Sequence, residues 1–206
     1  QATPLTYDNV SSIMFLRPEI SCVGMNEQEA RRQGIAHRVA RVGFALTNRG
    51  IINRPQYAAE YYAAPSSEDM TGAESVKRRL EWGESRLERS GFVKMIVADD
   101  DEHPTLLGLR VAGEGSSSVI EAAAMLIHEK GSCIRLENVL HPHPSLSEAV
   151  QDCARMLMRR SIYKPHVFSS CWVRRWLPAE SEDQEPTIVS QGLVPSYGFD
   201  EEDMMN

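Results

Sequence analysis

A β-hairpin followed directly by a helix is the sequence feature that most restricts how this chain can fold. Residues 91–98 are mostly apolar and β-branched, which predicts a strand, and residues 106–111 return as a second strand after an acidic turn at 99–102. Residues 116–130 then show the serine cap and the apolar spacing of a helix. Two antiparallel strands and a helix joined this closely favour an α+β fold.

The remaining elements extend the same pattern. Apolar or alternating runs predict strands over 10–16, 21–24 and 37–46, and capping residues with helical spacing predict helices over 26–34 and 145–160. We therefore expect a mostly antiparallel sheet of four or five strands with helices packed on one face.

Two segments differ in composition from this body, which we place at residues 1–165. An insertion at about residues 50–90 interrupts the body. Apolar positions at helical spacing between 73 and 87 predict that this insertion contains a charged helix. Residues 166–206 are acidic and contain several prolines, which predicts an irregular, extended tail.

Charge argues against a nucleic-acid partner. The chain has 206 residues and a formal net charge of −7. Eight of the acidic residues lie in 180–206, which contains no Lys or Arg, so the rest of the chain is close to neutral. Nucleic-acid binding usually requires a strongly basic face.

The chain shows no signal for a membrane span, a disulfide framework or a metal cluster. Its longest apolar run, 122–127, is far shorter than a bilayer-crossing helix, although association with a membrane complex stays open. The four cysteines are scattered without a Cys-x-x-Cys pair, which favours reduced and buried thiols. Consecutive carboxylates on the turn at 99–102 point in different directions, which favours a hairpin tip over a metal site.

One short segment concentrates the residues that carry chemistry: His-Pro-His-Pro-Ser-Leu-Ser-Glu at 141–148. Glu148 could accept a hydrogen bond from His143 and so orient a general base. It could equally do no more than complete a helix capping box with Ser145. His141 and His143 could also form half of a metal site, but no third ligand is suggested, so we predict none.

Residues 141–148 resemble the His-x-His-Pro-Ser/Thr-Leu-Ser-Glu segment of the FAD-dependent pyridine nucleotide-disulfide oxidoreductases, in their C-terminal dimerisation (interface) domain. This family includes dihydrolipoamide dehydrogenase, glutathione reductase and mercuric reductase. Residues 17–24 resemble the same domain's Pro-Glu-Ile/Val-Ala-x-Val-Gly signature, and 91–94 its Gly-Phe-Val-Lys strand. The similar segments are collinear over about 7–46 and 91–160.

The resemblance implies roles for two residues. His143 would be the general acid/base for a dithiol, and Glu148 would orient it. The histidine would reach the flavin–disulfide site of a second copy across a two-fold dimer. The peptide bond between His143 and Pro144 would be cis, and FAD and NAD(P) would serve a full-length enzyme.

The chain also departs from the family. It contains no Gly-x-Gly-x-x-Gly for FAD or NAD(P) and no Cys-x₄-Cys redox disulfide, so we expect no cofactor-binding residue in it and no catalysis by this chain alone. It begins at Gln1, which fits either a part cut from a longer chain or the intracellular product of transit-peptide removal in a plastid or mitochondrion.

Two functions are therefore weighed. We favour a non-catalytic accessory or structural subunit that docks onto the protein subunits of a larger assembly, such as an organellar respiratory or photosynthetic complex, through its insertion and tail. The alternative is the interface domain of a FAD/NAD(P)-dependent disulfide oxidoreductase, which supplies His143 and Glu148 in trans to the partner subunit.

Overall fold

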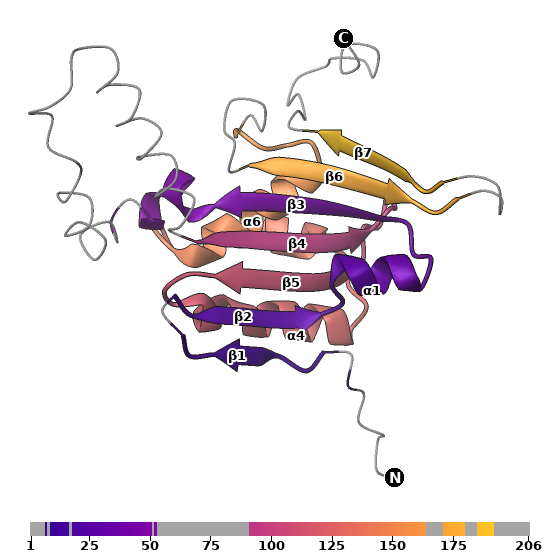
Figure 1. Ribbon diagram of the computed structural model, residues 1–206. Helices are drawn as coiled ribbons and strands as arrows, with labels where there is room; N and C mark the ends of the chain where they lie inside the picture. Colours follow the sequence, from indigo (N-terminus) through magenta and orange to yellow (C-terminus); the bar gives the residue numbers. More distant parts are fainter. Residues whose placement is uncertain are drawn as a thin grey trace, which may run out of the picture.

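Seven strands form a single antiparallel sheet with the spatial order β1-β2-β5-β4-β3-β6-β7 (Figure 1). The computed structural model describes residues 7, 9–16, 18–50, 52, 91–163, 171–179 and 185–191. The strands are β1 (Ser12–Met14), β2 (Ile20–Gly24), β3 (His37–Gly43), β4 (Phe92–Ala98), β5 (Leu106–Ala112), β6 (Trp172–Leu177) and β7 (Thr187–Gln191). The helices are α1 (Glu27–Arg32), α4 (Ile120–His128), α5 (Ile134–Asn138) and α6 (Leu146–Leu157), with 3₁₀ turns at Phe44–Leu46 and Ser116–Val119.

The structure confirms the α+β class and the antiparallel sheet, but the sheet has more strands than the sequence predicted. The two additional strands, β6 and β7, lie in the segment that we expected to be irregular, so that expectation was wrong for 172–177 and 187–191. Pro178 and Pro186 lie outside both strands and do not interrupt either one. The predicted insertion helix falls outside the described residues.

The main core lies between the sheet and two helices. In Figure 1 α4 and α6 lie behind the sheet, where α6 packs on β3 and β4 and α4 packs on β2 and β5. Alternate residues of each strand face these helices, as period-two burial requires. The fully buried side chains of this core include Val42, Val93, Met95, Leu109, Val111, Cys153 and Met156.

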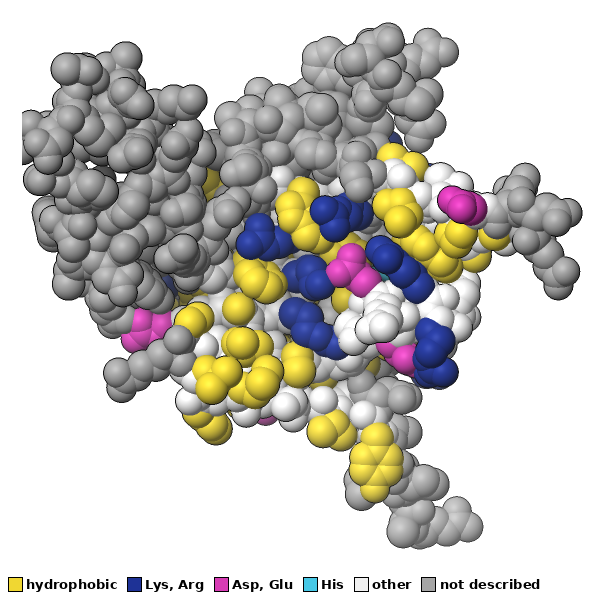
Figure 2. All heavy atoms as spheres, viewed as in Figure 1, with side chains coloured by type: hydrophobic (Ala, Val, Ile, Leu, Met, Phe, Trp, Pro, Cys, Tyr) yellow, Lys and Arg dark blue, Asp and Glu magenta, His cyan; other side chains and the backbone are white. Residues whose placement is uncertain are grey.

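The opposite face of the sheet is partly open. The short helix α1 lies in front of the strand ends in Figure 1. The sequence predicted that all helices pack on one face, and α1 is the exception. His37, Val39, Ile96 and Trp176 are buried on this side and lie outside the main core. The His37 ring stacks on the Trp176 ring at a centroid distance of 5.3 Å. Figure 2 shows Lys and Arg side chains beside hydrophobic ones on this face.

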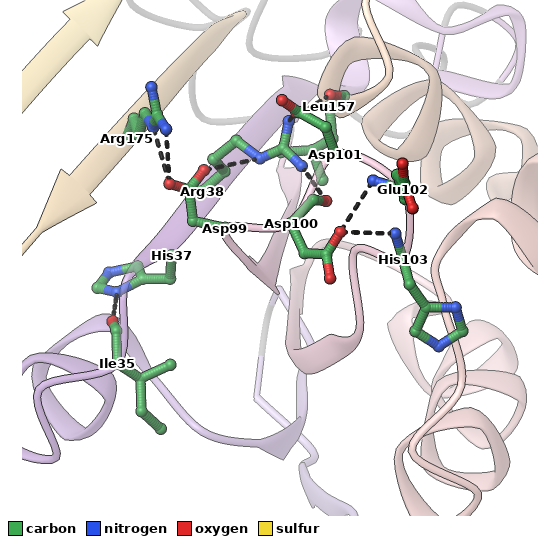
Figure 3. A network of polar contacts seen from close by, with 10 residues as sticks. All are labelled: Ile35, His37, Arg38, Asp99, Asp100, Asp101, Glu102, His103, Leu157 and Arg175. Carbon is green, nitrogen blue, oxygen red and sulfur yellow. Dashed lines mark hydrogen bonds and ion pairs between the residues drawn. The ribbon is translucent and has the colours of Figure 1, made fainter.

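The acidic turn between β4 and β5 forms ion pairs with arginine side chains (Figure 3). Buried Arg38 lies 3.3 Å from the Asp99 carboxylate, and it donates to the Asp101 carboxylate at 2.8 Å and to the Asp100 carbonyl at 2.6 Å. Arg175 of β6 pairs with the other oxygen of the Asp99 carboxylate, Oδ2, at 2.8 Å. The predicted hairpin tip is confirmed, and these contacts bind it to β3 and β6.

The four cysteines are free thiols, as the sequence predicted. Cys133, Cys153 and Cys171 are buried, and Cys22 is partly exposed. Burial raises the pKa of Cys133 to about 12 and that of Cys171 to about 11, so these thiols stay protonated near neutral pH. Among the described residues no helix is long and apolar enough to cross a membrane.

Candidate acid–base site

His143 and Glu148 meet at the start of α6. The His143 Nδ1 atom lies 2.7 Å from Glu148 Oε1. The second carboxylate oxygen, Oε2, accepts the backbone N–H of Ser145 at 2.8 Å, within a capping box at the helix start. Glu148 therefore contacts the histidine and caps the helix at the same time, with one oxygen for each, so the two interpretations of this residue are compatible.

This geometry lowers the pKa of Glu148 and selects the tautomer of His143. Burial acts to raise the pKa of Glu148, but the hydrogen bonds from His143 and Ser145 outweigh it and hold the pKa below its usual value. An ionised carboxylate only accepts hydrogen bonds, so Nδ1 of His143 carries the proton and Nε2 is the atom left to exchange one. The His143 side chain is 62% exposed and that of Glu148 is 27% exposed. Glu148 thus contacts one ring nitrogen of an exposed histidine and leaves the other, Nε2, outside this contact.

Hydrogen bonds from α6 hold the segment that leads to His143. Gln151 of α6 donates from Nε2 to the Glu137 carbonyl at 2.7 Å and to the Val139 carbonyl at 3.1 Å. The peptide bond between His143 and Pro144 is cis, as the family resemblance predicted. The sequence did not reveal the role of Gln151, because an amide on an apolar helix face gives no local sign of what it binds.

His141 has a different role from that of His143. Its Nε2 donates to the carbonyl of Leu136 at 3.0 Å, so it stabilises the end of α5 rather than facing His143. In the part of the chain that the structure describes, no group of three or more His, Cys, Asp or Glu side chains could hold a metal ion.

Asp152 adds a titratable group that no sequence motif singled out. It lies one helical turn after Glu148, and burial raises its pKa to about 6, against the opposing effect of Arg155, whose nearest nitrogen is 3.6 Å away. The sign that could have revealed Asp152 is its place as an acidic residue within a run of buried α6 positions. The start of α6 therefore contains one carboxylate whose pKa is lowered and a second whose pKa is raised.

The comparisons with known proteins agree with this fold. Residues 10–154 match the family described as pyridine nucleotide-disulphide oxidoreductase, dimerisation domain, and the chain belongs to that family. Curated relatives include the mitochondrial dihydrolipoyl dehydrogenases of Dictyostelium discoideum, 25% identical over 150 residues, and of Canis lupus familiaris, 24% identical over 151 residues. These alignments cover 73% of this chain but 23–24% of the relatives, so the chain spans about a quarter of their length.

Solved structures show the same fold. LpdA of Mycobacterium tuberculosis superimposes with a TM-score of 0.52 at 21% identity, over 77% of this chain and 27% of that protein. The flavoprotein disulfide reductase RclA of Escherichia coli gives 0.50 at 22% identity, over 72% of this chain and 26% of that protein. The matched part of this chain is thus an oxidoreductase dimerisation-like domain.

Proposed function

We propose that this chain is an interface domain that presents His143 as a general acid/base, oriented by Glu148, to a redox centre held by a partner polypeptide. The single observation that carries the proposal is the 2.7 Å contact between Nδ1 and Oε1, which leaves Nε2 as the exchanging nitrogen of an exposed ring. A structural capping box needs the glutamate but has no use for the histidine.

The chemistry assigned to the pair is proton transfer. Nε2 of His143 takes a proton from a thiol and later returns it, and the neighbouring carboxylate stabilises the imidazolium that forms in between. Because the matched relatives are named dihydrolipoyl dehydrogenases, a dithiol is the substrate class we propose. FAD and NAD(P) would serve the complete enzyme, but this chain has no Gly-x-Gly-x-x-Gly, so we assign those cofactors to no residue in it.

Apolar side chains beside the site support its use at an interface. Leu140 is 97% exposed, and its neighbour Val139 is also exposed. Large apolar side chains exposed together next to a reactive group are typical of a surface that another protein covers. The partner would be a second copy of the complete polypeptide across a two-fold dimer, or another subunit.

The experiment is an activity assay on the native polypeptide or assembly that contains this sequence. We expect His143→Gln to lower the rate of dihydrolipoyl oxidation by about 10²–10⁴-fold, the usual contribution of a positioned acid/base. Glu148→Gln should lower it less and move the pH profile, because it removes the orienting charge but not the base. His103→Gln, at an exposed histidine just after the acidic turn, is the matched control. An unchanged rate in His143→Gln would contradict the proposal.

A second candidate is the non-catalytic subunit of a larger assembly in a mitochondrion or plastid. The observation that favours it is the position of β6 and β7, which lie beyond the family match at 10–154 and widen the sheet. The denatured mass of the native polypeptide separates the two candidates. A band near 23.1 kDa, detected with an antibody to residues 140–160, would support an accessory subunit, and a much larger band would support the complete enzyme.

A further inference from the structure

Four cationic side chains lie close together across the open face of the sheet. In the strand register Arg110 of β5 is opposite Lys94 of β4, Lys94 is opposite Arg41 of β3, and Arg41 is opposite Trp172 of β6. Arg174 lies two residues further along β6. Both strand neighbours of Arg41, Lys94 and Arg110 belong to the main core, as does Val173 beside Arg174, so these side chains face away from α4 and α6. Figure 2 shows dark-blue side chains gathered over the middle strands of this face.

The cations of this basic row, Arg41, Lys94, Arg110 and Arg174, are held against the sheet. The guanidinium of Arg41 lies 4.6 Å from the centroid of the Phe92 ring, and that of Arg174 lies 4.2 Å from the Trp172 ring. Arg110 donates to the carbonyl of Gly24 at 2.8 Å. Lys94 pairs with Glu27 of α1 at 2.6 Å. Positive charge and aromatic rings are therefore positioned in advance on one surface.

Strand β7 ends close to the level of this row. Gln191 is opposite Val173, so β7 ends one residue before the level of Trp172 and of the row. The row crosses from β6 to β5, about 14 Å at the usual spacing between strands. The eight residues 192–199 can span about 26 Å when extended, which is enough to reach every cation of the row.

The chemistry of residues 192–206 is complementary to the row. The segment contains four consecutive acids at 200–203, two aromatic residues, Tyr197 and Phe199, and no Lys or Arg. Carboxylates form their strongest hydrogen bonds with guanidinium groups, and aromatic rings stack on arginine. We propose that residues 192–206 bind in cis across the basic row, with the acids at 200–203 paired to its cations, and so cover the open face of the sheet.

The test uses a full chain whose own segment cannot compete. In the neutralised chain, Asp200→Asn, Glu201→Gln, Glu202→Gln and Asp203→Asn keep the length but remove the charge. A labelled synthetic peptide of residues 192–206 should bind this chain, as measured by fluorescence anisotropy, and bind the unmodified chain at least about tenfold more weakly, because the row is already occupied. Binding should weaken as salt is raised.

Two controls keep the result interpretable. Arg174→Glu, at an exposed position of the row, should weaken peptide binding to the neutralised chain by about tenfold or more, whereas Arg159→Glu, an exposed arginine just after α6 on the helix-covered side, should not. A peptide with the same four acids neutralised should not bind, and this control does not depend on how any protein variant folds.

Several outcomes would overturn the proposal. No peptide binding, or binding that is equal for the charged and neutral peptides, would remove the basic row as the site. Equal binding by the neutralised and unmodified chains would exclude occupation in cis. A dimer of the unmodified chain that dissociates on dilution and is absent from the neutralised chain would place the segment on a second copy instead.

Discussion

Two clusters in this molecule combine acids with bases, and they differ in almost every other respect. Arg38 and Asp99 are buried, far apart in sequence, and surrounded by further polar partners. His143 and Glu148 are five residues apart and more exposed, and the carboxylate engages Nδ1 of the histidine but not Nε2. The first cluster satisfies its charges within the fold, whereas the second leaves a proton acceptor available. Burial, more than residue type, separates the two clusters.

The largest effect is expected from breaking the buried cluster. Arg38→Leu leaves Asp99 buried beside one arginine and removes the donor for the Asp100 carbonyl, so the free energy of unfolding should fall by about 3–5 kcal/mol. Urea unfolding followed by circular dichroism measures this. Arg175→Leu is the matched control, because its side chain is about half exposed, and it should cost about 1 kcal/mol or less. Equal effects of the two variants would show that Arg38 has no special place in the fold.

Asp152 sharpens the comparison, because it is a buried acid beside the exposed pair. Its pKa is about 6 in the fold against an ordinary 3.8, so between these pH values the folded state holds a proton that the unfolded state releases. The stabilising effect of that proton is complete below about pH 4 and is lost as the pH rises through 6. Asp152→Asn should therefore be more stable than the unmodified chain at pH 7.5, by about 1–3 kcal/mol.

Melting temperatures across the pH range test this prediction. The difference between Asp152→Asn and the unmodified chain should disappear below about pH 4. If the Asn variant were the less stable of the two at pH 7.5, the ion pair with Arg155 would outweigh the cost of burying the carboxylate, and the prediction would be wrong.

Glu148→Gln should have a smaller effect on stability, of about 0.5–1 kcal/mol, because the amide retains part of the capping interaction with Ser145. The sign of its pH dependence is opposite to that of Asp152. The lowered pKa of Glu148 means that its contribution is present above its ordinary pKa and is lost as the pH falls through the folded value. Thermal melts of this variant should thus approach those of the unmodified chain in acid. A constant difference at every pH would point to packing rather than charge.

His143→Gln should change stability least, by less than about 0.5 kcal/mol, because the ring is mostly exposed. The same denaturant measurement checks it. A loss as large as that of Arg38→Leu would show that the histidine is structural and would remove the basis for an acid–base role.

The sequence predicted those features whose residues lie close together along the chain. The hairpin at 91–111, the helix at 145–160 and the meeting of His143 with Glu148 depend on spacing and capping within a few residues. The family resemblance supplied the rest of the core. Strand β6 was missed because its partner β3 is far away in sequence, and β7 pairs with β6 alone. Prolines and acids around both strands are typical of irregular chain.

The buried groups could not be predicted for a related reason. The pairing of Arg38 with the turn at 99–101 and the raised pKa of Asp152 arise from packing between distant elements. A sequence pattern shows that such residues are polar, but their burial becomes visible only once the elements are assembled.

The most direct test of the acid–base role of His143 is the pH profile of dihydrolipoyl oxidation by the native polypeptide or assembly that contains this sequence, compared between His143→Gln and His103→Gln. We predict that His143→Gln lowers the rate by about 10²–10⁴-fold at every pH, with assembly and stability unchanged, while His103→Gln behaves like the unmodified protein. Equal activity and equal pH profiles in the two variants would contradict this role.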